Sequence, residues 1–263
     1  MSLFPNPYSA ESHLLFESLG YLIGFQLYLK ARRSSGPPIT SMQALSIVAG
    51  AISGAMLGSK LLYIAEYPAY ALADFPNWPQ LLGGKTIVGG LLGGVIGVEV
   101  AKKLENITQS TGDSIVFALL VGMMLGRVGC FLAGLNDNTY GGTTSLPWAV
   151  DFGDGLPRHP TPLYEIAFLA ALYAGLRALS TNGFRHFLLS GDLFRLFMLA
   201  YLLWRFGIDF IKPPHTEVTA WERTHSQAHL YFGWLTSLQL ACITGWLYYF
   251  RDLKRIVSRA APV

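Results

Sequence analysis

The sequence predicts an all-α polytopic membrane protein, with seven transmembrane helices in a single integral-membrane domain over residues 1–263. The first observation is composition: 52% of the residues are hydrophobic and only 13% are charged, against about 25% charged residues in a soluble domain. The second is a set of seven apolar stretches, and the third is the gathering of Lys and Arg after alternate stretches. This composition excludes a soluble α/β enzyme and a disordered tail that binds nucleic acid.

The seven apolar stretches are expected to be helices, because backbone polar groups in lipid must be satisfied within their own segment. A span takes about 20 residues, so the first, third and fifth stretches are short and the other four are long enough. In chain order the stretches are Leu14–Leu29, Met42–Ile64, Thr86–Val100, Ser114–Leu135, Leu163–Leu179, Asp192–Ile211 and Leu230–Phe250.

Basic residues predict the orientation of the chain. Eleven of the nineteen Lys and Arg residues lie at or just after the ends of the first, third, fifth and seventh stretches, four lie in the other loops, and the remaining four lie within stretches. Because cytoplasmic loops carry an excess of Lys and Arg, the N-terminus is expected outside and the C-terminus in the cytoplasm. The long loops after the fourth and sixth stretches then lie outside, so we expect chemistry or binding on the extracytoplasmic side.

The second and third stretches carry glycines at four-residue steps. Such faces let membrane helices approach closely, and they can also make room for a lipid headgroup or chain. The GGLLGG segment lies inside an apolar stretch, so it is not expected to form a phosphate-binding loop of a nucleotide site. The stepped glycines are Gly50, Gly54 and Gly58 in one stretch and Gly89, Gly93 and Gly97 in the next.

Ionisable side chains within the stretches are the candidate functional residues, because each costs roughly 2.5–3.5 kcal/mol at membrane depth. Arg127 has no acidic neighbour in sequence. It either reaches toward the membrane surface or faces inward and holds an anion such as phosphate. Arg205 and Asp209 lie four residues apart on one predicted helix face. They either neutralise each other as an ion pair or form a phosphate-binding arginine that is oriented by its acid.

Two further ionisable features have open interpretations. His13 and Glu17, four residues apart at the start of the first stretch, form either an interfacial cap or a general base or proton relay. Lys60 is either a structural charge or a contact for a lipid phosphate. The two cysteines, Cys130 and Cys242, lie in apolar stretches and do not indicate a disulfide framework.

No cofactor and no metal site are expected from the sequence. It contains no CxxC pair, which is the commonest pattern of a zinc site. Three histidines precede the last stretch, but their spacing and their lack of nearby carboxylate partners favour an ordinary outer loop. These histidines are His215, His225 and His229.

Two sequence blocks carry a family resemblance: GRVGCFLAG at Gly126–Gly134, at the end of the fourth stretch, and SLPWAVDFGDGLPRHPTPLYE at Ser145–Glu165, in the loop that follows and the start of the fifth stretch. They resemble the GRIGNFINGE, LPWGV and RHPSQLYE motifs of the bacterial prolipoprotein diacylglyceryl transferase family. The resemblance covers nearly the whole chain, and it also implies seven helices with the N-terminus outside. The other similar blocks are GSKLLY (Gly58–Tyr63), KTIVGGLLGG (Lys85–Gly94), YLLWRFGIDFIKPP (Tyr201–Pro214) and LTSLQ (Leu235–Gln239).

The resemblance implies a reaction in the bacterial cytoplasmic (inner) membrane. The diacylglyceryl group of phosphatidylglycerol moves to the lipobox cysteine thiol of a prolipoprotein, and glycerol phosphate leaves. The implied partners are this phospholipid and a prolipoprotein signal peptide, with no nucleic acid. Arg127 and Arg205 match the family's two essential arginines, and Asp209 replaces a glutamate. The remaining matched positions, expected to bind substrate, are Lys60, Gly89, Gly90, Gly141, Arg158, His159, Tyr164 and Glu165.

The chain departs from the family at the positions that activate the thiol. Val88 stands in place of the catalytic histidine, Cys130 in place of an asparagine, and Glu17 in place of a tyrosine. Valine cannot carry a proton. His13, Glu17 and Cys130 are therefore candidates for a different base or nucleophile, although a buried cysteine is commonly inert packing.

The loop after the fourth stretch is longer than in the family, and its Asn136, Asp137 and Tyr140 are expected to form a different headgroup or acceptor pocket. Three functions stay open. The first is the lipoprotein reaction or a close variant, and the second is a related phospholipid-dependent transferase with another acceptor. The third is a non-enzymatic lipid-binding or transport protein, against which the lack of a visible inverted repeat counts.

Overall fold

The computed structural model describes residues 10–35, 39–68, 71, 84–137, 139–181, 188–212, 230–231 and 234–260. Within these ranges each of the seven predicted stretches coincides with one α-helix, so the all-α prediction is confirmed. The helices are α1 (Ala10–Ser35), α2 (Ser41–Glu66), α5 (Ile87–Leu104), α6 (Asp113–Ala133), α7 (Thr161–Thr181), α8 (Asp192–Ile208) and α10 (Ser237–Ala260).

Three of the described helices, α2, α6 and α7, are long and apolar enough to cross a membrane by length and composition. The others differ from them in identifiable ways. Helix α8 has only 17 residues, and α10 carries four basic residues along its second half. The membrane character of the chain is therefore established by three helices.

Short non-helical elements lie between the helices. Two antiparallel pairs form, one between β1 (Val150–Asp151) and β2 (Pro157–Arg158), the other between β3 (Leu230–Tyr231) and β4 (Leu235–Thr236). Two 3₁₀ turns extend helices: η1 (Gly134–Asp137) follows α6 and η3 (Asp209–Ile211) follows α8.

The last helix begins later than the sequence pattern predicts, at Ser237 and not at Leu230. The preceding residues instead form the β3–β4 pair. Thr236 fixes the start of the helix, because its hydroxyl accepts the Gln239 N–H at 3.1 Å and its own N–H donates to the Gln239 side chain at 3.0 Å. This reciprocal arrangement is a capping box, and Thr40 with Gln43 starts α2 in the same way.

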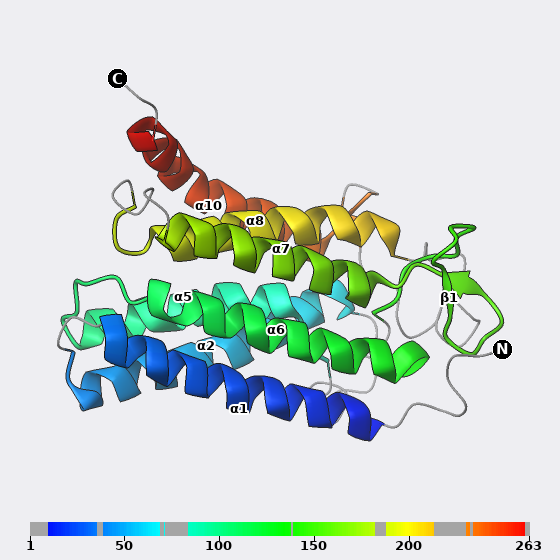
Figure 1. The fold of residues 1–263 in the computed structure, drawn as a ribbon, viewed down its shortest axis with the longest axis horizontal. Helices are drawn as coiled ribbons and strands as arrows, with labels where there is room; N and C mark the ends of the chain where they lie inside the picture. The colour runs from blue at the N-terminus through cyan, green and yellow to red at the C-terminus, as the bar shows by residue number, and fades with distance from the viewer. Residues whose placement is uncertain are drawn as a thin grey trace.

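The helices lie lengthwise beside one another, with successive helices running in opposite directions (Figure 1). Contacts pair α1 with α6, α2 with α5, α6 with α7, and α8 with α10. We call one end of the bundle the hairpin end: it carries β1 and β2, and there α6 and α8 end while α1, α7 and α10 begin. The opposite end, the basic end, carries the Lys and Arg residues that close α1, α5 and α10.

The glycines of α2 and α5 are a packing device, which confirms the first of the two sequence interpretations. A methyl group at Gly54 would overlap the Gly93 carbonyl oxygen, and one at Gly58 would overlap the Gly89 carbonyl oxygen. The two backbones therefore touch, as they do in membrane helix pairs with small residues at the contact. This contact holds the start of α5, and with it Val88, at a fixed height beside α2.

Two carboxylates organise the basic end, the half-buried Asp113 and the fully buried Asp192. Asp113 of α6 accepts the backbone N–H groups of Gly191 and Phe194 at 2.6 and 3.1 Å, and so caps the start of α8 from a different helix. Asp192 has no exposed surface and contacts Arg195 at 2.8 Å and Arg259 at 3.0 Å. These bonds connect the start of α8 to α6 and α10, far from the hairpin end.

Candidate functional site

Glu165 of α7 lies between two arginines from two other helices. Its Oε2 atom is 3.0 Å from Arg127 Nε of α6 and 3.5 Å from Arg205 Nη1 of α8. All three side chains are buried, with 2%, 7% and 9% of the residue surface exposed for Glu165, Arg127 and Arg205. The other carboxylate oxygen, Oε1, accepts the hydroxyl of the fully buried Tyr201 at 2.7 Å. Three helices thus meet at one carboxylate.

The charge of this trio is unbalanced. Within the trio, two guanidinium groups and one carboxylate leave a net charge of +1, and a buried charge is costly unless a further anion balances it. An anion that binds between the arginines would relieve that cost. Because a guanidinium presents five N–H donors in a planar fork, phosphate is the anion that suits the trio best.

Asp209 does not form the predicted pair with Arg205. Its Oδ1 atom is 2.8 Å from Lys212 Nζ, and its Oδ2 atom accepts the Thr236 hydroxyl at 2.9 Å. The helix gives way to the 3₁₀ turn η3 at Asp209, and the four-residue spacing brings side chains together only within an α-helix. Burial alone would lower the pKa of Lys212, but the Asp209 carboxylate raises that pKa above its usual value.

His13 and Glu17 do lie together, at the hairpin end of α1. The His13 Nε2 atom is 3.6 Å from a Glu17 oxygen. Glu17 also contacts Lys85 Nζ at 2.8 Å and accepts the Tyr21 hydroxyl at 2.8 Å. Lys85 precedes α5 and stands three residues before Val88, so this contact connects α1 to the start of α5.

Cys130 and Asp137 adjoin the same histidine. Asp137 Oδ1 lies 3.1 Å from His13 Nδ1, and Cys130 belongs to the same close group. Arg127 donates from Nη1 to the Cys130 sulfur at 3.5 Å, so the His13 group and the Glu165 trio are neighbours. Asn136 lies in η1 beside Asp137, but its side chain is outside the described residues.

The predicted residues around β1 and β2 mainly stabilise the loop between α6 and α7. Arg158 is buried and pairs with Asp154 at 2.7 Å, and its guanidinium stacks over the Tyr140 ring at 4.8 Å. Gly141 packs so closely that an added Cβ would lie 2.6 Å from the His159 Cβ and 2.9 Å from the Ile211 carbonyl oxygen. Glycine at this position therefore lets the loop sit against the end of α8.

His159 and Tyr164 form the accessible part of the hairpin end. The His159 Nδ1 atom is 3.1 Å from the Tyr164 hydroxyl, and the exposed Trp148 donates its indole N–H to the same hydroxyl at 2.8 Å. Two aromatic rings and an imidazole thus share one polar network at the start of α7. Rings with a polar tip suit a membrane interface, where one end is apolar and the other meets water.

The remaining predicted residues lie along α2 and α5. Lys60 donates to the Gly84 carbonyl oxygen at 2.5 Å, which connects α2 to the segment before α5. Gly89 packs against α2, whereas a Cβ at Gly90 would meet its nearest atom, the Ala55 carbonyl oxygen, at an ordinary 3.8 Å. Val88 has no exposed surface and belongs to the apolar core, so the position at which the sequence resemblance expects a histidine holds a packed apolar side chain.

Sequence reasoning missed three polar groups near the site: the buried Glu66 and Tyr201, and the half-buried Lys212. Glu66, only 2% exposed, accepts the Leu238 backbone N–H at 2.8 Å at the start of α10. Tyr201 and Lys212 complete the bonds of Glu165 and Asp209. A glutamate at the end of an apolar stretch and a lysine just after one were the available signals, but nothing in their local spacing identified a partner.

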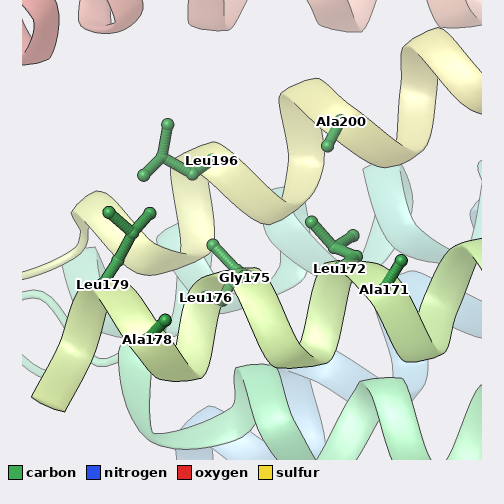
Figure 2. A pocket seen from close by; sticks show the side chains of 8 residues that line it. All are labelled: Ala171, Leu172, Gly175, Leu176, Ala178, Leu179, Leu196 and Ala200. Carbon is green, nitrogen blue, oxygen red and sulfur yellow. The ribbon is translucent and has the colours of Figure 1, made fainter. Parts of the chain in front are cut away.

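A groove on the described surface is apolar and separate from these polar groups. It lies between α7 and α8, has a volume of about 520 Å³, and is lined only by Ala, Leu and Gly side chains (Figure 2). Its α7 residues, from Ala171 to Leu179, are on the half of that helix away from Glu165. The groove suits hydrocarbon and contributes no chemical group.

Comparison with known proteins identifies the family of the chain. A family profile described as prolipoprotein diacylglyceryl transferase matches residues 6–250. The chain belongs to this family. A protein of Nitratidesulfovibrio vulgaris named phosphatidylglycerol–prolipoprotein diacylglyceryl transferase is 31% identical over 233 residues, which cover 85% of this chain and 81% of that protein. A protein of the same name from Azotobacter vinelandii is 34% identical, over 86% of this chain and 83% of its own length.

A third relative of the same name, from Geobacter sulfurreducens, is 31% identical over 78% of this chain and 81% of its length. The structure brings together three residues from separate blocks of the family resemblance: Arg127 of GRVGCFLAG, Glu165 at the end of RHPTPLYE, and Arg205 of the sixth stretch. The three motifs are far apart in sequence and meet at one carboxylate.

Proposed function

We propose that this chain is a membrane enzyme that transfers the diacylglyceryl group of phosphatidylglycerol to the cysteine thiol of a prolipoprotein, and so acts in lipoprotein biosynthesis. The names of its relatives support this substrate pair. The observation that carries the proposal is the buried trio of Arg127, Glu165 and Arg205, whose net positive charge suits a phosphate group. No relative's name supplies that geometry.

The trio fits the leaving group of the reaction. The thiol loses its proton to water, its sulfur forms a bond to the terminal glycerol carbon of the diacylglyceryl group, and the bond from that carbon to the phosphate oxygen breaks. Glycerol phosphate leaves with the electron pair of the broken bond, so negative charge grows on the phosphate. Arg127 and Arg205 stabilise that charge in a site of low dielectric, where preorganised donors act most strongly. Glu165 and Tyr201 hold the arginines in place.

The remaining predicted residues have more distant roles in this proposal. Tyr140, Gly141, Arg158 and His159 shape the loop that receives the headgroup or the acceptor peptide at the hairpin end. Lys60 and Gly90 lie at the hairpin-end half of α2 and α5, where a lipid headgroup would enter. Gly89 contributes through packing, and Asp209 through its bonds to the end of α8.

The same proposal includes seven spans, with the hairpin end outside and the basic end in the cytoplasm of the inner membrane. The gathering of Lys and Arg at one end of the bundle supports this orientation. Cysteine labelling in spheroplasts tests it, because Ser145 and Thr181 are exposed at opposite ends while Cys130 and Cys242 are buried. Ser145→Cys should react with an impermeant maleimide in intact spheroplasts, and Thr181→Cys should react only after the spheroplasts are permeabilised. The reverse pattern would refute the orientation.

A reconstituted assay tests the reaction itself. Purified protein in vesicles with labelled phosphatidylglycerol should label a prolipoprotein substrate, and should not label a variant substrate whose lipobox cysteine is serine. Arg127→Ala and Arg205→Ala should abolish labelling while Arg195→Ala, at the basic end, retains it. Full activity of either site variant would exclude the proposed role of the arginines. Bound lipid without turnover would instead favour a lipid-binding protein.

A different acceptor is the second candidate function, and Val88 favours it. A buried valine occupies the place of the family histidine, so the thiol-activating group of the family is missing there. Expression in a cell depleted of its own diacylglyceryl transferase separates the two candidates. Rescue of growth supports the lipoprotein acceptor, and failure of a well-expressed protein that still consumes phosphatidylglycerol supports another acceptor.

A further inference from the structure

Three potential metal ligands meet at the hairpin end, beside the arginine trio. They are a ring nitrogen of His13, the sulfur of Cys130 and a carboxylate oxygen of Asp137, and all three atoms lie within 4.8 Å of one another. The residues belong to α1, α6 and η1, and His13 lies more than a hundred positions before the other two in the sequence. For this reason no local spacing motif indicates the group, and the sequence predicts no metal there.

We propose that His13, Cys130 and Asp137 bind a zinc ion. Imidazole nitrogen, thiolate sulfur and carboxylate oxygen are the three ligand types that zinc takes in proteins. A tetrahedral zinc ion with bonds of about 2.0–2.3 Å holds its ligand atoms roughly 3.5 Å apart. The His13 and Asp137 atoms are already 3.1 Å apart, so the Cys130 sulfur is the atom that has to move closer, by at most about 1 Å, which is within the reach of side-chain rotation.

The hydrogen bonds around the group have the pattern of a metal site. His13 Nδ1 is buried and makes no hydrogen bond to any described residue, although Asp137 Oδ1 lies 3.1 Å away. The other ring nitrogen, Nε2, faces the Glu17 carboxylate at 3.6 Å. A histidine that binds metal usually presents its second nitrogen to a carboxylate, which fixes the ring and strengthens the ligand.

The supporting residues are themselves held in place. Glu17 is bonded to Lys85 and Tyr21, and the Thr139 hydroxyl donates to Asp137 Oδ2 at 2.9 Å, which leaves Oδ1 facing the histidine. Helices α1 and α6 approach closely at this height, because a Cβ at Gly129 would lie 2.9 Å from the Phe16 Cβ. The ligands are thus positioned by three rigid segments.

The zinc ion has a role if the proposed function holds, and this step rests on it. Three protein ligands leave a fourth position on the ion, as in catalytic zinc sites. We assign that position to the acceptor thiol, whose S–H proton passes to water while the sulfur keeps the electron pair and binds as a thiolate. Arg127 contacts Cys130 at 3.5 Å, so the thiolate would be held next to the phosphate-binding arginines. The ion would then supply the thiol activation that Val88 cannot.

Metal analysis of the purified full-length chain tests the site without any lipid or turnover. After loading with zinc and removal of the excess, the protein should hold one zinc ion per chain. Cobalt in its place should give the absorption of a thiolate–cobalt bond. Cys130→Ala and Asp137→Asn should each bind zinc at least about tenfold more weakly, whereas Cys242→Ala, a change at the other buried cysteine, should bind it normally.

Folding of the variants is checked by circular dichroism, and Asp137→Asn is the safer variant because that side chain is 16% exposed. Wild-type protein that binds no more zinc than Cys130→Ala would overturn the metal site. Such a failure would leave the proposed transfer reaction untouched, since zinc content is measured without activity. Conversely, a zinc-loaded protein with no transferase activity would refute the reaction and leave the site standing.

A peptide experiment tests the role of the ion. A lipobox peptide that contains cysteine should increase the thiolate–cobalt absorption of the cobalt-loaded protein, and the same peptide with serine should not. Equal spectra with the two peptides would overturn the assignment of the fourth position to the acceptor thiol.

Discussion

Arg127 Nε lies 3.0 Å from Glu165 Oε2, and this contact joins α6 to α7 at the hairpin end of the bundle. The same carboxylate oxygen is 3.5 Å from Arg205 Nη1 of α8. A single glutamate therefore sets the separation of the two arginines to which we assign the phosphate group. The first prediction concerns the loss of that shared charge.

Glu165→Gln should strongly destabilise the protein. It leaves two buried guanidinium groups without a carboxylate, and loss of one partner of a buried ion pair costs about 3–5 kcal/mol. Unfolding in detergent, followed by circular dichroism, measures the change. The control is Glu99→Gln, since the Glu99 side chain is 59% exposed in its pair with Lys102 and should cost less than about 1 kcal/mol. Equal stability of the two variants would show that the trio does not stabilise the fold.

Arg205→Lys should reduce transfer about a hundredfold, although the positive charge is kept. Lysine lacks the planar fork that can contact Glu165 and a phosphate group together, and one lost donor to a developing charge costs about 10²–10³ in rate. Initial rates at saturating phosphatidylglycerol measure the effect. Arg195→Lys, at the basic end beside Asp192, is the matched change and should keep the wild-type rate. A wild-type rate for Arg205→Lys would mean that charge alone suffices.

Gly54→Ala should destabilise the α2–α5 pair. The new methyl group overlaps the Gly93 carbonyl oxygen, which belongs to a rigid helix backbone, and overpacking of this kind costs about 1–3 kcal/mol. Gly94→Ala is the control, because a methyl group there meets its nearest atoms at an ordinary 3.6 Å. That variant should be neutral or gain up to about 1 kcal/mol from helix propensity. Thermal unfolding of both proteins decides, and the reverse ranking would refute the observed contact.

Asp113→Ala should lower stability without changing the transfer chemistry. The substitution removes the acceptor of the Gly191 and Phe194 N–H groups at the start of α8, and loss of a helix cap costs about 0.5–2 kcal/mol. Asp113→Asn, which keeps one oxygen acceptor, should fall between wild type and alanine. Activity per folded molecule should be unchanged in both, since the basic end is remote from Glu165. A fall in that specific activity would indicate coupling between the two ends.

The helices could be predicted well because their signals are local. A run of apolar side chains and a capping residue are read within one segment, and each predicted stretch is indeed a helix. The start of the last helix was predicted wrongly because hydropathy was the only local signal there. Leu230 and Tyr231 are apolar, but they pair with Leu235 and Thr236 as strands, and hydropathy does not distinguish a short strand from an extra helical turn.

Which side chains form ion pairs with one another could not be predicted in the same way. Arg205 has Asp209 four residues away and Glu165 forty positions away in sequence, and the ion pair forms with the distant residue. The helix changes to a 3₁₀ turn at Asp209, and the packing of α7 against α8 brings Glu165 to the arginine. A local spacing rule fails where the local geometry changes.

The sequence by itself determined the all-α membrane class, the positions of the helices, the close glycine contact and the two arginines that the family resemblance marks. Only the tertiary structure decided that Glu165 joins those arginines, that Asp209 pairs with Lys212, and that His13, Cys130 and Asp137 come together. Hydropathy and capping act between residues a few positions apart, so a single segment contains them. Ion pairs and metal ligands act across helices, and which helices become neighbours is settled by packing of the whole bundle.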